Sequence, residues 1–113
     1  MNMHWNHKQK LAVLKSLCYI VGADRKIMPQ EMQLLQGYLN RVGLTVSAMN
    51  EQAEMSQSQM QLLISQMSAS DKKLIASFWK QAMMCDNHIA DEEIHVIMAM
   101  AAACQLEFAD VVI

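Results

Sequence analysis

The fold of this chain is decided by a stretch of ten residues that occurs twice, as Ala23 to Met32 (ADRKIMPQEM) and, 62 positions later, as Cys85 to Ile94 (CDNHIADEEI). The two copies share the pattern Asp-x-x-Ile-x-x-x-Glu, and its acidic residues pair Asp24 with Asp86 and Glu31 with Glu93. The same offset also aligns apolar residues further along, Leu35 with Ile97 and Leu44 with Leu106. A repeat at a fixed offset indicates two copies of one structural unit.

Composition indicates what kind of unit repeats. The chain has 113 residues, of which 53% are hydrophobic and 18% charged, so residues 1–113 are expected to form one domain with a real core. Only three Gly and one Pro occur, and a chain so poor in turn-forming residues favours long helices over many short strands. The fold class expected is therefore all-α.

Helix signals divide the chain into two halves and a connector. Apolar residues recur at intervals of three and four over about 7–22 and 29–42, and again over about 70–84 and 91–104. Pro29 suits the first position of the second helix, while Gly43 followed by Leu44 is a stop signal. Between the halves, 47–55 is expected to form a short helix and Ser56 to cap another. The prediction is a compact helical bundle of two helix–loop–helix units, about 7–46 and 69–108, joined by a helical connector.

Neither half could bury its apolar stripe alone, so the two must share a core. We expect Leu17, Leu35, Trp79 and Ile97 to be buried there, and residues 7–42 to superpose on residues 69–104. Met32 and Met98 are also expected to face inward. The twelve methionines are read mainly as gap-fillers in this core, with an adaptable partner surface in the Met- and Gln-rich segment 47–67 as the alternative.

Charge and cysteine usage narrow the function classes. A net charge of −2 with no basic run argues against nucleic acid as a partner. No apolar run approaches the length of a membrane span. The three cysteines, Cys18, Cys85 and Cys104, lie far apart without a C-x-x-C pair, so free thiols and a cytoplasmic location are expected.

The sequence lacks the ligands that two common metal-binding motifs, the EF-hand and the di-iron helix pair, would require. An EF-hand loop ending at Glu31 would need oxygen ligands at Ile20 and Gly22 and a glycine at Arg25. Glu92-x-x-His95 has the spacing of a di-iron helix, but the first copy offers Gln30 and Gln33 in place of a partner motif. With no catalytic Ser, Cys or His constellation in view either, the chain is expected not to be an enzyme.

The double helix–loop–helix with Asp-x-x-Ile-x-x-x-Glu in each half resembles the tellurite-resistance TerB-like family over nearly the whole chain. The resemblance implies a compact all-helical domain in a stress-response assembly. It also implies that paired acidic residues hold a metal ion, a role that falls here to Asp24, Glu31, Asp86 and Glu93. The glycine that usually follows the Asp in the family is Arg25 in the first copy and Asn87 in the second. Because Asn tolerates a left-handed backbone better than Arg does, the second loop is expected to bind more tightly.

An oxygen-only ligand set of this kind favours Mg²⁺, Ca²⁺ or Mn²⁺ over Zn²⁺. The structural alternative is that these carboxylates only cap helices and shape loops, since acidic residues at helix starts are common for stability alone. The leading hypothesis is thus a non-enzymatic domain that binds a divalent cation or small ligand. The alternative is a protein–protein interaction module whose acidic loops are purely structural.

Overall fold

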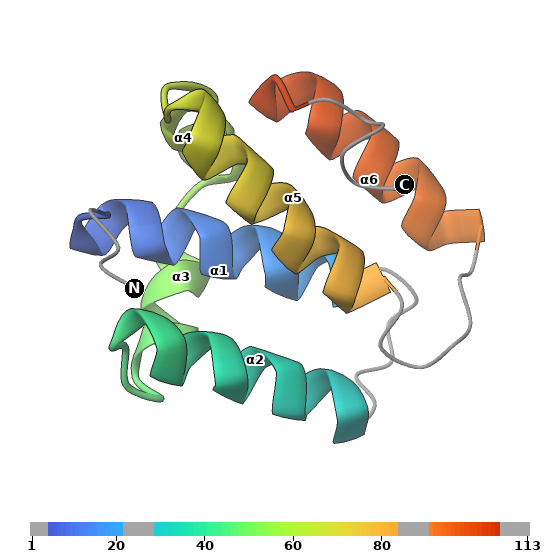
Figure 1. Ribbon diagram of the computed structural model, residues 1–113. Helices are drawn as coiled ribbons and strands as arrows, with labels where there is room; N and C mark the ends of the chain where they lie inside the picture. The colour runs from blue at the N-terminus through green and yellow to red at the C-terminus, as the bar shows by residue number, and fades with distance from the viewer. Residues whose placement is uncertain (1–4, 22–28, 84–90, 107–113) are drawn as a thin grey trace.

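Six helices make up the described part of the chain, which comprises residues 5–21, 29–83 and 91–106 of this computed structural model (Figure 1). In chain order they are α1 (His7–Val21), α2 (Pro29–Val42), α3 (Ala48–Glu54), α4 (Gln57–Ser65), α5 (Ala69–Met83) and α6 (Asp91–Cys104). The described residues contain no strand, so the predicted all-α class is confirmed.

The repeat in the sequence is matched by a repeat in the helix boundaries. Helices α1 and α5 both have 15 residues, and α2 and α6 both have 14. Each boundary in the second pair lies 62 positions after its counterpart in the first, the same offset that relates the acidic stretches. The two helix pairs therefore begin and end at equivalent residues, while α3 and α4 belong to the connector between them.

Local capping explains where several helices begin. Asn6 Oδ1 accepts a hydrogen bond from the Gln9 amide at 2.8 Å, and Gln9 Oε1 accepts one from the Asn6 amide at 2.9 Å, which together form a capping box. Ser56 caps α4 as predicted, through the Gln59 amide at 3.1 Å. At the start of α5 the cap is Ser68, whose hydroxyl accepts from the Asp71 amide at 3.2 Å.

Helix α1 is the centre of the bundle, and each of the other five helices packs against it (Figure 1). The four residues predicted to share the core are all at most 1% exposed, which confirms that prediction: Leu17, Leu35, Trp79 and Ile97. They form two pairs at the repeat offset, so equivalent positions of both units are buried in the same core. None of the described helices combines the length and apolarity needed to cross a bilayer.

Two inward predictions were wrong. Met32 is 48% exposed and Met98 is 50% exposed. The buried face of α6 is set by Ile97, Met100, Ala101 and Cys104, and Met98 lies one residue, about 100°, around the helix from Ile97. Many other methionines do fill the core, as predicted for gap-fillers: Met55, Met60, Met67, Met83 and Met100.

Candidate functional site

Of the four predicted ligand residues, Glu31 is the one whose side chain lies within the described part of the structure. It is the third residue of α2 and only 2% exposed, and it shares that burial with no other charged side chain of the described residues. Asp24 and Asp86 lie outside the described residues. Glu93 is the third residue of α6, the position equivalent to Glu31, and its side chain also lies outside what is described.

The described side chains include no group of three His, Cys, Asp or Glu residues close enough to hold a metal ion. The structure thus supplies one buried carboxylate at the first acidic turn and an equivalent backbone position at the second. A carboxylate removed from water requires a cation, a basic side chain or N–H donors around it, because an isolated buried charge is costly. The start of a helix, where Glu31 lies, contributes part of that stabilisation.

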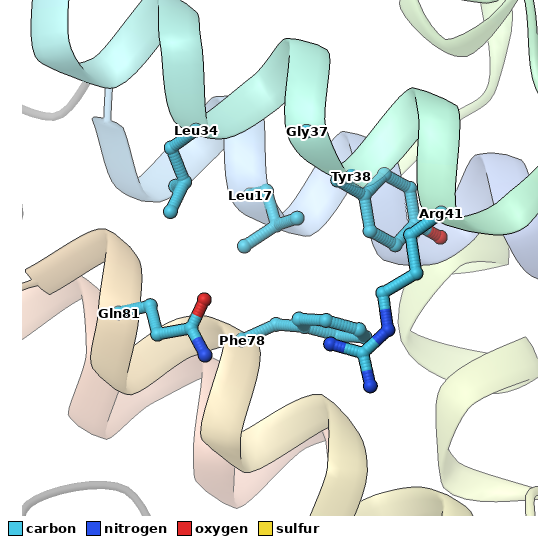
Figure 2. Close-up of a pocket in the computed structure, with 7 residues that line it drawn as sticks. All are labelled: Leu17, Leu34, Gly37, Tyr38, Arg41, Phe78 and Gln81. Atoms are coloured by element: carbon cyan, nitrogen blue, oxygen red, sulfur yellow. The ribbon is translucent and has the colours of Figure 1, made fainter. Parts of the chain in front are cut away.

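A cavity of about 290 Å³ lies between α2 and α5, and sequence analysis did not predict it (Figure 2). Its lining residues come from three helices: Leu17 from α1, then Leu34, Gly37, Tyr38 and Arg41 from α2, and Phe78 and Gln81 from α5. Figure 2 shows α2 and α5 as opposite walls with Leu17 between them. Hereafter this cavity is called the α2–α5 groove.

Aromatic contacts hold one end of the α2–α5 groove in place. The Tyr38 and Phe78 rings meet edge to face with centroids 5.3 Å apart, and the Arg41 guanidinium carbon lies 5.2 Å from the Phe78 centroid (Figure 2). The Tyr38 hydroxyl donates to the Lys10 carbonyl at 2.9 Å. Burial raises the pKa of that phenol, so it stays a neutral donor across the physiological range. The lining of the groove is mostly apolar, with the Arg41 guanidinium and the Gln81 amide as its polar groups. An apolar lining with a few polar groups is typical of binding sites.

The sequence did contain a signal for this groove in Gly37. Glycine in a helix interior costs about 0.5–1 kcal/mol relative to alanine, so its presence there calls for a packing or functional reason. A Cβ built on Gly37 meets nothing within 4 Å, which shows that the residue borders open space.

A second cavity, of about 230 Å³, lies on the other side of the bundle and is lined by Tyr19, Gln57, Gln61, His95, Ala99 and Met100. Helices α1, α4 and α6 supply these residues. His95, which the di-iron spacing singled out, therefore lies at a cavity wall formed with glutamines of α4.

Comparison with known proteins supports the helical fold. No family model matches the chain, and no curated protein matches it. Among solved structures, it is similar to the crystal structure of a protein of unknown function from Porphyromonas gingivalis W83. The two are 25% identical, with a TM-score of 0.78 over 91% of this chain and 88% of that one. The fold is thus shared with an experimentally determined structure over most of both chains.

Proposed function

We propose that this chain is a non-enzymatic, TerB-like cytoplasmic module that binds a divalent cation at its acidic helix–loop–helix turns within a stress-response assembly. The observation that carries the proposal is the burial of Glu31 at the start of α2. A carboxylate that is 2% exposed has given up most of its hydration, and a bound cation would offset that loss.

The repeat supports extending this role to the second turn. Glu93 occupies the position in α6 that Glu31 occupies in α2, and Asp24 and Asp86 precede them at equal spacing. Four carboxylates with no thiolate or imidazole among them suit Mg²⁺, Ca²⁺ or Mn²⁺. The free thiols of Cys18 and Cys104 support a cytoplasmic location, since disulfides are rare in that compartment.

Titration of the metal-free protein with each cation, by calorimetry and by thermal unfolding, tests the proposal. A cation that binds only the native state adds about 2.7 kcal/mol of stability at a concentration one hundred times its dissociation constant. The isosteric variants Asp24→Asn, Glu31→Gln, Asp86→Asn and Glu93→Gln should each reduce the heat of binding. The two second-loop variants should reduce it more, because Asn87 suits the turn better than Arg25.

The opposite result is equally clear. If the wild type shows no heat and no thermal shift with any cation, while the variants lose stability as ordinary helix-cap deletions do, the carboxylates are structural.

The second candidate function is a protein–protein interaction module with structural acidic loops. The observation in its favour is the α2–α5 groove, whose lining is largely apolar and aromatic with an arginine at one end. It involves none of the four acidic residues, so the two functions can be tested separately and could coexist in one chain.

A further inference from the structure

The second cavity of the bundle has room for a small ligand. Its volume of about 230 Å³ exceeds the roughly 150 Å³ that is enough to hold a benzene ring. The cavity can therefore hold a planar bicyclic molecule of about ten non-hydrogen atoms. It lies where α4 packs against α1 and α6, and hereafter it is called the α4–α6 cavity.

The α4–α6 cavity is accessible from solvent. Of its lining residues, Tyr19 is 43% exposed, and His95 and Ala99 are also exposed. The two glutamines of α4 are half-buried, and Met100, at 1% exposed, is the buried member of the lining. A ligand can therefore reach the polar groups of the lining without displacing a helix.

The polar groups of this lining have hydrogen-bonding capacity to spare. Four polar side chains line the cavity and make no hydrogen bond or ion pair with any described residue: Tyr19, Gln57, Gln61 and His95. A carboxamide offers both a donor and an acceptor, and a phenol can do the same. A purely apolar ligand would displace water from these groups without replacing its hydrogen bonds, which loses affinity. The lining therefore favours a polar occupant.

The charge of the lining narrows the class of ligand further. Among the described residues that line the cavity there is no lysine, arginine, aspartate or glutamate. A phosphate or an ammonium group would lose hydration there without gaining a partner of opposite charge. The lining therefore favours a neutral ligand.

The two carboxamides are held in a fixed place by the packing of α4. Gln57 and Gln61 lie one turn apart on the same face of this helix, which Met60 and Ile64, both fully buried, anchor in the core. A glutamine carboxamide forms paired hydrogen bonds with one edge of adenine, accepting from the exocyclic amine and donating to the adjacent ring nitrogen. Tyr19 brings an aromatic ring to the same cavity, and nucleobases stack on such rings.

We propose that the α4–α6 cavity binds a neutral, planar heterocycle that presents a donor and an acceptor side by side, as adenine does. The carboxamides of α4 recognise this edge, the Tyr19 ring stacks on the heterocycle, and Ala99 and Met100 contact its apolar surface. Both carboxamides come from the connector, so the repeat does not generate a second copy of this site. None of the described lining residues is one of the four predicted cation ligands, so the site is independent of the acidic turns.

NMR titration of the isotopically labelled full chain with adenine, and separately with purine, tests the proposal. A chelator is present, so that the result does not depend on cation binding. Adenine should bind saturably with a dissociation constant of about 1 mM or lower, as a good ligand of about ten non-hydrogen atoms can. Purine lacks the exocyclic amine and should bind about fivefold more weakly or worse, because it loses one of the paired hydrogen bonds. The shifted amides should belong to α1, α4 and α6.

Two variants locate the binding, each with a matched control. Ala99→Phe fills the cavity and should weaken adenine about tenfold or more, whereas Ala102→Phe adds the same bulk elsewhere on the exposed surface of α6 and should leave the affinity unchanged. The double variant Gln57→Leu/Gln61→Leu should remove the preference for adenine over purine. Gln59→Leu, on α4 outside the lining, should keep that preference. Thermal unfolding of each variant verifies that it is folded.

Four results would each overturn the proposal. The first is the absence of saturable shifts with adenine up to about 5 mM, well above the expected dissociation constant. The second is equal affinity of the wild type for adenine and purine. The third is unchanged adenine binding in Ala99→Phe. The fourth is a set of shifted amides in α2 and α5, which would place the ligand in the α2–α5 groove instead.

Discussion

Gly43 and Gln105 end the two equivalent helices with the same left-handed backbone, at φ values of 76° and 60°. Each is followed by a leucine whose amide donates to a carbonyl five residues back, Leu44 to Leu39 and Leu106 to Ala101, both at 2.8 Å. The amides of Gly43 and Gln105 also donate three residues back, at 3.4 Å and 3.3 Å. Both α2 and α6 therefore end in a Schellman motif, one with its usual glycine and the other without it.

This difference predicts opposite effects of exchanging the two residue types. Gln105→Gly should stabilise the protein by about 1 kcal/mol, because a side chain at positive φ costs about 1–2 kcal/mol that glycine avoids. Gly43→Ala should destabilise it by a similar amount for the same reason. Urea unfolding measures both. Ala102→Gly, on the exposed face of α6, is the control and should be destabilising, so a loss of stability in Gln105→Gly would contradict the prediction.

The second prediction concerns the polar link between α1 and α5. The Trp79 indole N–H donates to the Ser16 hydroxyl at 2.9 Å, and that hydroxyl donates to the Val13 carbonyl at 2.6 Å. Both residues are fully buried, so Ser16→Ala leaves the indole N–H without its acceptor and should cost about 1–3 kcal/mol.

A control variant distinguishes the loss of the buried hydrogen bond between Trp79 and Ser16 from the loss of a serine hydroxyl alone. Ser77 is half-buried and its hydroxyl donates to the Leu74 carbonyl at 2.7 Å, so Ser77→Ala should cost less than Ser16→Ala. Thermal or urea unfolding gives the comparison. Equal losses in the two variants would show that the indole contact contributes little.

The third prediction concerns the thiols of Cys18 and Cys104, which are free. Burial raises the pKa of Cys18 to about 11 and that of Cys104 to about 12, against an ordinary value of 9.0. Because the thiolate is the reactive form, both should label slowly at pH 8 and roughly tenfold faster per pH unit above it, as long as the fold persists. Mass spectrometry of a Cys85→Ser background measures the labelling of each site, and fast native labelling of both would contradict the prediction.

The same shifts predict how stability depends on pH. A thiol whose pKa is higher in the native state than in the unfolded chain favours the native state fully below the unfolded pKa. That contribution is lost as the pH rises from about 9 towards 11 and 12. Replacing both cysteines with alanine should therefore flatten the alkaline fall in stability, as urea titrations at pH 8, 9 and 10 would show.

The fourth prediction concerns Gly37 in the middle of α2. Because a Cβ there meets nothing within 4 Å and the equivalent residue is Ala99, Gly37→Ala should stabilise the protein by about 0.5–1 kcal/mol. The comparison with Gly43→Ala is informative, since the same substitution should have the opposite sign at the helix end. A loss of stability in Gly37→Ala would contradict this prediction, because it would show that the added methyl group disturbs packing beside the α2–α5 groove.

Local sequence was sufficient for most of the helix boundaries. Pro29 begins α2, Gly43 follows its last residue, and Ser56 caps α4, all as predicted. Backbone hydrogen bonding near a cap involves residues within three or four positions, so the residues next to a helix end are enough to predict where the helix begins or ends. Ser68 and Ser70 both offer a hydroxyl near the start of α5, and the path by which the chain enters the helix selects Ser68 as the cap.

The buried face of a helix was harder to predict than the residues at which the helix begins and ends. Periodicity placed Met98 on the inward stripe of α6, while the structure buries Met100 and exposes Met98. The residues of α6 are apolar on nearly all sides, so the sequence offers more apolar positions than the bundle can cover. Which of them is buried depends on where α1 and α4 approach the helix.

The repeating unit can be predicted from the amino-acid sequence, because an offset of 62 relates helix starts, helix ends and the core pairs Leu17 with Trp79 and Leu35 with Ile97. These are properties of single helices and their apolar stripes, which short-range hydrogen bonding and side-chain periodicity encode. The difference between the two halves depends on the three-dimensional packing of the helices. Helix α4 packs against α1 and α6, and neither connector helix of the described residues packs to the same extent against the equivalent pair, α2 and α5. The position of α4 depends on which helix surfaces contact each other in space. Contacts between residues far apart in the chain produce no periodic pattern in the amino-acid sequence from which they could be predicted.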